Sequence, residues 1–358
     1  MQIIDADGHV EEGEQTWSYL PPELHERRPV PVLFAADTTW GEHNGGWLID
    51  YKIRKFAASP TAMLRAQRRG YAIPSMEVTD VQARLADMDG AGIDKQVIYP
   101  SSWLGCLSED LELEIALTQS HNEFMATQCN QSGGRLFYGA VLPYRSPEAA
   151  IREIRRVRQM GSAVALFMRG LEWDIPVTHP MFWPVFEEAE RQDLVIGLHT
   201  GFGSPTIRRL FEGVPRPKPD PFPHIHPLTG GLQLVQHALG CVMSSTVMED
   251  FPKLRWALLE TGSEWVVPAI KAHSRRKGRD LSRYFHEGRF FVTCEPDENL
   301  DYVMATLGEN CLVVASDMPH GDSFSHANPG DEFVQRGDLS ETTLQKLLQD
   351  NARSLYKI

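Results

Sequence analysis

Short apolar runs alternate along the chain with longer segments in which apolar residues recur at helical spacing. The runs are almost continuously apolar, which is typical of strands covered on both faces of a parallel sheet. Eight runs are predicted to be strands: Gln2–Ile4, Gln96–Tyr99, Tyr138–Leu142, Ala163–Phe167, Leu194–Leu198, Arg255–Leu259, Phe290–Thr293 and Cys311–Ala315.

The segments between these runs are predicted to be helices: Thr79–Ala91, Glu109–Gln131, Pro147–Met160, Pro180–Gln192, Gly231–Phe251, Asp297–Leu307 and Glu341–Ser354. Eight strands that alternate with helices predict the α/β class and one (β/α)8 TIM barrel over residues 1–358. A doubly wound open sheet is the alternative. It would place its ligand near one topological switch point rather than on a ring of strand ends.

Two segments depart from the barrel pattern. Residues 34–77, which include Trp40, Trp47 and Tyr51, are predicted to be an insertion that covers one barrel end. Residues 200–230 are rich in Gly and Pro and form a predicted long loop after the fifth strand. A loop of this length in a compact domain is commonly functional.

Composition narrows the classes of partner. The hydrophobic fraction of 42% and charged fraction of 23% are typical of a globular protein. A net charge of -13 argues against nucleic acid, and no apolar run has the length of a membrane span. The five cysteines include no C-x-x-C pair, and the N-terminus lacks a signal-peptide pattern. We therefore expect a cytoplasmic protein with reduced thiols.

Six side chains of metal-binding types fall just past predicted strand ends: Asp7, His9, His199, Glu260, Glu295 and Asp317. Residues two apart in an extended segment point the same way, so Asp7 and His9 can reach one cation. Barrel enzymes build their sites at the carboxyl ends of strands, so this coincidence predicts a metal-dependent active site. Asp317 can also deprotonate a bound water, and His320 is placed to orient the ligands.

Each of these residues also has a structural interpretation. Asp5 or Asp7 can accept backbone hydrogen bonds, and His199 can be a buried histidine bonded to the main chain. Asp317 can cap the following turn, and Glu260 or Glu295 can pair with an arginine of the barrel mouth.

Four further residues are candidates on weaker signals. His224 and His226, two apart in the long loop, can share a cation or be exposed. Trp103 can line a substrate pocket and Arg169 can anchor a substrate carboxylate. Packing is the competing interpretation of both residues.

The chain resembles the amidohydrolase superfamily, and most of all the branch with the aminocarboxymuconate semialdehyde decarboxylase-like enzymes. The resemblance rests on IIDADGH, LHTG, FPKLRWALLETGSEW, ASDMPHGD and DNARSLYKI, and it extends over essentially the whole chain. It implies one divalent metal bound by Asp7, His9, His199 and Asp317. It also implies a small-molecule substrate and a homodimer.

The strand-six position departs from that resemblance. Decarboxylases of the branch typically have a catalytic histidine there, whereas this chain has Glu260. A glutamate can bind a second metal, which His224 and His226 would complete. Mixed carboxylate and imidazole ligands suit iron, zinc or manganese, in one or two ions.

Four functions therefore compete. The first is a metal-dependent hydrolase, with Asp317 as general base and Glu260 orienting the water or binding a second ion. The second is a dinuclear non-haem iron oxygenase. The third is a non-oxidative decarboxylase, ranked lower because of Glu260, and the fourth is an inactive barrel that acts as a binding partner.

Overall fold

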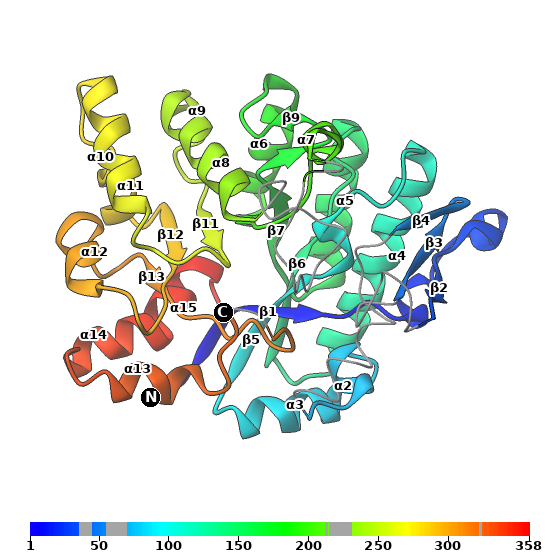
Figure 1. Cartoon of the computed structure of the whole chain (residues 1–358), viewed down its shortest axis with the longest axis horizontal. Coiled ribbons are helices and arrows are strands. Elements are labelled where there is room, and N and C mark those ends of the chain that lie inside the picture. Colours follow the sequence, from blue (N-terminus) through cyan, green and yellow to red (C-terminus); the bar gives the residue numbers. More distant parts are fainter. Residues whose placement is uncertain (36–44, 55–69, 212–213, 215–230, 322–323) are drawn as a thin grey trace.

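The computed structural model describes residues 1–35, 45–54, 70–211, 214, 231–321 and 324–358. Eight parallel strands form one sheet at its centre, each neighbouring the next along the chain (Figure 1). They are β1 (Ile4–Val10), β5 (Lys95–Pro100), β6 (Leu136–Ala140), β7 (Ala163–Arg169), β10 (Val195–His199), β11 (Trp256–Leu259), β12 (Phe290–Thr293) and β13 (Leu312–Val313). Each overlaps one predicted strand.

Backbone hydrogen bonds join the first strand to the last and close the barrel. Ala6 N donates to Val314 O at 2.9 Å, and Asp317 N donates to Asp7 O at 2.9 Å. His9 N donates to Met318 O at 2.6 Å. The (β/α)8 barrel is therefore confirmed, and the open doubly wound sheet is wrong. We call this junction between β1 and the segment after β13, residues 314–318, the seam.

Helices surround the barrel on its outer face (Figure 1). The α-helices are α2 (Ile73–Met76), α3 (Val81–Gly90), α4 (Leu111–Cys129), α5 (Pro147–Met160), α6 (Trp183–Arg191), α7 (Pro205–Leu210), α8 (Leu232–Ser244), α9 (Val247–Asp250), α10 (Val266–Lys277), α11 (Arg283–His286), α12 (Leu300–Leu307), α13 (Pro329–Gln335), α14 (Glu341–Gln345) and α15 (Asn351–Tyr356). The 3₁₀ helices are η1 (Glu14–Trp17), η2 (Pro22–Arg27), η3 (Ser102–Leu104) and η4 (Pro180–Phe182), and a π-helical turn, η6 (Lys346–Asp350), precedes α15.

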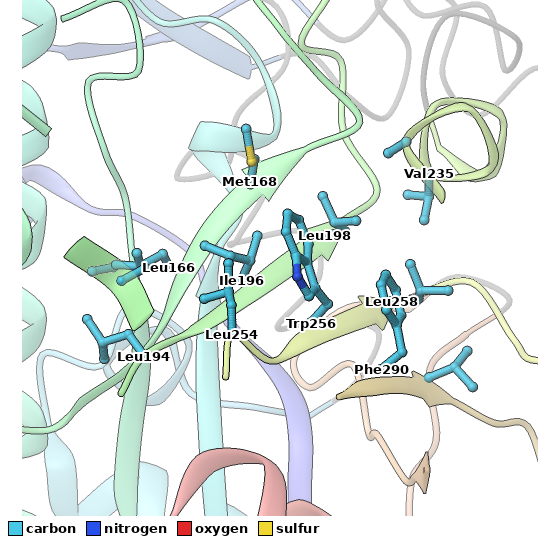
Figure 2. Close-up of a cluster of buried hydrophobic side chains, with 14 of the residues drawn as sticks. Leu166, Met168, Leu194, Ile196, Leu198, Val235, Leu254, Trp256, Leu258 and Phe290 are labelled. Carbon is cyan, nitrogen blue, oxygen red and sulfur yellow. The ribbon is translucent and has the colours of Figure 1, made fainter. Parts of the chain in front are cut away.

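Apolar side chains fill the layer between the strands and the helices. Figure 2 shows part of this layer, with Ile196, Leu198 and Trp256 on the strands and Val235 on α8. The Trp256 ring stacks on Phe290 with centroids 6.0 Å apart. Truncating one such buried side chain to alanine lowers the free energy of unfolding by about 2–5 kcal/mol. The packing of this layer therefore stabilises the strands that carry the site.

An irregularity in β1 sets the direction of its side chains. Ile4 and Ala6 belong to the cluster that fills the barrel interior, whereas Val10 packs in the outer layer. The pairing register between β1 and β5 shifts between Asp5 and Gly8. Regular alternation would send Asp5 and Asp7 to the same face. The shift separates them, as their contacts below show.

A small antiparallel sheet consists of β2 (Val30–Leu33), β3 (Gly45–Ile49) and β4 (Lys52–Arg54). β3 and β4 fall within residues 34–77, and the insertion that covers one barrel end stays a prediction. Arg27 ties the sheet to the start of α4 by pairing with Asp50 and Asp110, each at 2.7 Å. Trp40 lies outside the described residues.

The segment after β10 contains a short helix, α7, and then residues 212–213 and 215–230, which lie outside the described residues. A second hairpin, β8 (Leu171–Glu172) with β9 (Ile175–Pro176), follows β7. Among the described helices, we find none whose length and apolarity would let it cross a membrane.

Candidate metal centre

Four buried side chains converge at the carboxyl end of the barrel. Asp7 and His9 lie within β1 rather than past its end, His199 is the last residue of β10, and Asp317 follows β13. His199 Nε2 lies 3.3 Å from Asp7 Oδ1 and 3.2 Å from His9 Nε2. His9 Nε2 lies 3.4 Å from Asp317 Oδ1. Each residue has 0% or 1% of its surface exposed.

These separations suit a shared divalent cation. Ligand atoms held at about 2.1 Å from one ion lie about 3.0 Å apart in an octahedron and about 3.4 Å apart in a tetrahedron. The separations of 3.2–3.4 Å agree with either arrangement. Two carboxylates and two imidazoles buried together also require a positive charge, because burying unbalanced charge is costly. Asp7, His9 and His199 therefore fit a divalent metal, and Asp317 approaches this group at His9.

The electrostatics at His199 indicate the same preference for a cation. Burial by itself lowers the pKa of His199. The negative charges of Asp7 and Glu260 outweigh this effect, and the pKa rises from 6.5 to about 9. A field that favours a proton on this ring also favours a metal ion at its Nε2. His199 Nδ1 lies 2.9 Å from the carbonyl oxygen of Thr200, which fixes the ring.

Further hydrogen bonds orient Asp317. His320 Nδ1 lies 2.7 Å from Asp317 Oδ1, and the hydroxyl of Ser325 donates to Asp317 Oδ2 at 2.6 Å. On its other side, His320 Nε2 lies 2.9 Å from Ser101 Oγ and 3.5 Å from Glu11 Oε1. His320 thus contacts Asp317 directly, and its predicted role of orienting the metal ligands stays a prediction.

Two acidic residues at the rim have left-handed backbone conformations. The φ angle is 55° at Glu260, directly after β11, and 53° at Asp317. Non-glycine residues in this region cost on the order of 1 kcal/mol and concentrate at functional sites.

Glu260 lies beside His199 and Thr200. Its Oε2 is 3.5 Å from His199 Nε2 and accepts a hydrogen bond from the Thr200 hydroxyl. The described residues whose ligand atoms cluster most tightly are Asp7, His9 and His199 in one group and His9, Asp317 and His320 in another. Neither group includes Glu260, and its predicted role as ligand or catalytic residue stays a prediction.

Two predicted site residues are engaged elsewhere. Glu295 Oε2 lies 2.6 Å from His326 Nε2, so it pairs with a histidine rather than with an arginine. Arg169, only 4% exposed, forms a salt bridge with Glu172 and donates to the carbonyl of Gly105 at 2.7 Å. These contacts engage Arg169 within the protein, and the prediction that it anchors a substrate carboxylate stays a prediction.

The remaining candidates are less constrained. Trp103 is 4% exposed in η3, with its ring edge-on to His121 at a centroid separation of 6.3 Å. This position is compatible with a pocket wall, and its substrate contact stays a prediction. His224 and His226 lie outside the described residues.

Sequence reasoning missed a buried pair next to the site. Glu12 has 0% exposure, accepts a hydrogen bond from Ser102 N at 2.7 Å, and lies 3.6 Å from His121 Nδ1. Burial raises the pKa of Glu12 to about 8 and lowers the pKa of His121 to about 3. Both groups are therefore uncharged near neutral pH. Glu12 is five residues beyond Asp7, but no sequence pattern predicts its contact with α4.

The sequence is similar to those of gamma-resorcylate decarboxylases. The gamma-resorcylate decarboxylase of Rhodococcus jostii is 26% identical over 326 residues, which is 80% of this chain and 92% of that protein. The enzyme of the same name from a Polaromonas species is 23% identical over 321 residues, with the same coverage of both chains.

Solved structures share the fold. An amidohydrolase from Mycobacterium avium subsp. paratuberculosis superposes with a TM-score of 0.77 at 17% identity, covering 99% of each chain. A dihydroxybenzoic acid decarboxylase from Polaromonas, solved with manganese and the inhibitor 2-nitroresorcinol, gives a TM-score of 0.66 at 20% identity. That match covers 99% of this chain and 97% of the other.

The amidohydrolase family model matches residues 4–358, which include both the barrel and the four buried side chains described above. Together with the barrel and its buried ligands, this match shows that the chain belongs to the amidohydrolase family.

Proposed function

We propose that this protein is a metal-dependent decarboxylase that acts on a hydroxylated aromatic carboxylic acid. The observation that carries the proposal is the convergence of Asp7, His9, His199 and Asp317 in a chain whose similar proteins are decarboxylases. From the sequence alone, hydrolysis was the first hypothesis and decarboxylation ranked lower. The similar proteins are decarboxylases, so they favour loss of carbon dioxide over addition of water.

The four ligands would hold the metal, which when bound supplies a positive charge that binds and orients a substrate carboxylate. Decarboxylation then breaks the bond between the ring carbon and the carboxylate and forms a bond from that carbon to a proton. The reaction consumes one proton and no oxidant.

We propose that Asp317 transfers that proton. Its Oδ1 lies 2.7 Å from His320 Nδ1, and His320 Nε2 lies 2.9 Å from Ser101 Oγ. This hydrogen-bonded chain provides a route by which a proton reaches Asp317 and, from its carboxylate, the ring carbon. From the sequence alone, Asp317 was predicted to act as a general base that removes a proton from water. The same carboxyl group serves either direction.

Glu260 distinguishes this site from decarboxylases with a histidine at the sixth strand. Its carboxylate shares the Thr200–His199 corner of the site, with Thr200 as hydrogen-bond donor. It cannot supply the positive charge of a histidine. We propose that it helps to select the substrate, favouring compounds with a hydrogen-bond donor, such as a ring hydroxyl, at this corner.

The test is release of carbon dioxide from a panel of acids by protein loaded with manganese. The panel contains 2,6-dihydroxybenzoate, 5-carboxyvanillate and benzoate, with esters and amides of the same acids. We expect carbon dioxide from at least one hydroxylated acid, none from benzoate, and loss of activity in His199→Ala. Hydrolysis of the esters or amides, or oxygen consumption without carbon dioxide release, would show that the reaction is of another kind.

A further inference from the structure

Arg84 of α3 lies buried behind the metal centre. None of its surface is exposed. Burying a guanidinium group costs several kcal/mol unless it is fully hydrogen-bonded, so its partners indicate why the charge is kept there. Burial lowers the pKa of Arg84 to about 10, although the charge of Asp5 opposes this, so the group is protonated at neutral pH.

The Arg84 guanidinium bonds the main chain on both sides of the seam. Its Nη2 donates to the carbonyl of His9 at 3.0 Å and to the carbonyl of Met318 at 3.1 Å. His9 is one of the metal ligands, and Met318 directly follows the ligand Asp317. One side chain therefore fixes the distance between two segments that carry ligands and come from opposite ends of the sequence.

Gln96 extends this network to a second point of the seam. Arg84 Nε donates to Gln96 Oε1 at 2.9 Å, and Gln96 Nε2 donates to Asp5 Oδ2 at 2.6 Å. Asp5 in turn accepts hydrogen bonds from the backbone nitrogen of Ser316, at 2.9 Å, and from its hydroxyl. The side-chain amide of Gln96 thus links the buried groups of Arg84 and Asp5. The last hydrogen bonds of this network reach Ser316, which directly precedes Asp317.

Gly8, between the ligands Asp7 and His9, makes room for this network. A β-carbon at Gly8 would lie 2.6 Å from Gln96 Cδ, well inside van der Waals contact. The glycine is required by this close approach. It explains why a residue without a side chain separates the two ligands of β1.

We propose that Arg84 is a positioning residue, which acts through Gln96 and Asp5 to hold the seam at the spacing that metal binding requires. The proposal rests on the metal centre described under the proposed function. It predicts that the network can be damaged without touching any ligand, and that the damage weakens metal binding more than it weakens the fold.

The test compares Arg84→Met with Arg255→Met. Arg255 is the control. It directly precedes β11 at the opposite end of the barrel, and its side chain is 11% exposed. It donates to the carbonyl of Leu355 at 2.8 Å and pairs with Asp193, which precedes β10. The dissociation constant for Mn²⁺ and the melting temperature are measured for each. We expect Arg84→Met to weaken Mn²⁺ binding about 10–100-fold. Arg255→Met should lower the melting temperature and leave Mn²⁺ binding within about twofold of the wild type.

Gly8→Ala provides a second variant in case Arg84→Met does not fold. It crowds Gln96 and leaves the side chains of Arg84 and of all the predicted ligands chemically unchanged, so it should also weaken Mn²⁺ binding. The inference is overturned if folded Arg84→Met or Gly8→Ala binds Mn²⁺ as tightly as the wild type, or if Arg255→Met weakens binding equally. It is also overturned if the wild type binds no Mn²⁺. A wild type that binds Mn²⁺ but releases no carbon dioxide refutes the proposed reaction and leaves the role of Arg84 standing.

Discussion

His320 connects a metal ligand to the polar residues behind it. Its Nδ1 meets Asp317 Oδ1 at 2.7 Å, and its ring stacks on that of His9 with centroids 4.1 Å apart. Residues that orient a ligand from behind typically contribute 10–100-fold to metal affinity or activity.

We expect His320→Ala to weaken Mn²⁺ binding about 10–100-fold, because Asp317 loses the group that fixes its carboxylate. His320→Asn should recover most of this loss, because an asparagine amide can occupy the position of the Nδ1 group. Calorimetric titration with Mn²⁺ measures both. Equal binding by His320→Ala and the wild type would mean that Ser325 alone suffices to orient Asp317.

Glu12 gives a prediction about stability and pH. Its pKa is raised by burial from 4.5 to about 8, so the folded state holds a proton that the unfolded chain releases. The stability associated with this carboxyl is fully present below pH 4.5 and is lost as pH rises through 8, with a slope of at most about 1.4 kcal/mol per pH unit.

Glu12→Gln removes this titration and keeps a neutral group of the same shape. The free energy of unfolding of Glu12→Gln should therefore change less between pH 5 and pH 8 than that of the wild type, by denaturant titration at each pH. His121 is neutral in the folded state because burial lowers its pKa from 6.5 to about 3, so the unfolded chain gains a proton there as pH falls below 6.5. This contribution is the same in both proteins and cancels in the comparison. Parallel pH profiles for the two proteins would show that Glu12 is ionised in the folded state.

At the scale of elements, Arg169 joins β7 to the loop after β5. Its Nε lies 3.1 Å from Glu172 Oε2, and its Nη1 donates to the carbonyls of Trp103 and Gly105. The sequence shows an arginine at a strand end, which is the right place for a substrate anchor. It does not show that Glu172, three residues on, turns back across a hairpin to pair with it.

We expect Arg169→Met to lower the free energy of unfolding by about 3–5 kcal/mol, because Glu172 is left buried without its partner. Arg169→Met with Glu172→Gln should recover part of this loss. Thermal and denaturant unfolding measure the effect. If Arg169 were a substrate anchor, the single variant would instead keep its stability and raise KM.

The elements also show where sequence patterns fail. The eight strands were predictable because each is a short apolar run between helical segments. The register shift in β1 was not, because it depends on pairing with β5 and on the space that Gly8 leaves for Gln96. The helix predicted from Thr79 has its cap at Asp80, whose Oδ1 accepts from the backbone nitrogens of Gln82 and Ala83.

For the whole molecule, the sequence predicted the place of the site better than its reaction. Asp7, His9, His199 and Asp317 could be selected because the carboxyl ends of parallel strands meet at one rim. The reaction depends on how the same ligands are used: metal-bound water, dioxygen and a substrate carboxylate need similar donors. Glu260 favoured hydrolysis or oxygenation on chemical grounds, whereas the similar proteins favour decarboxylation.

The most direct test of the account is to follow carbon dioxide release while metal-free protein is titrated with Mn²⁺ in the presence of 2,6-dihydroxybenzoate or the best acid of the panel. The account predicts that carbon dioxide release rises with bound Mn²⁺ and that His199→Ala loses both together. Release that is independent of bound metal, or tight Mn²⁺ binding that survives His199→Ala, would contradict it.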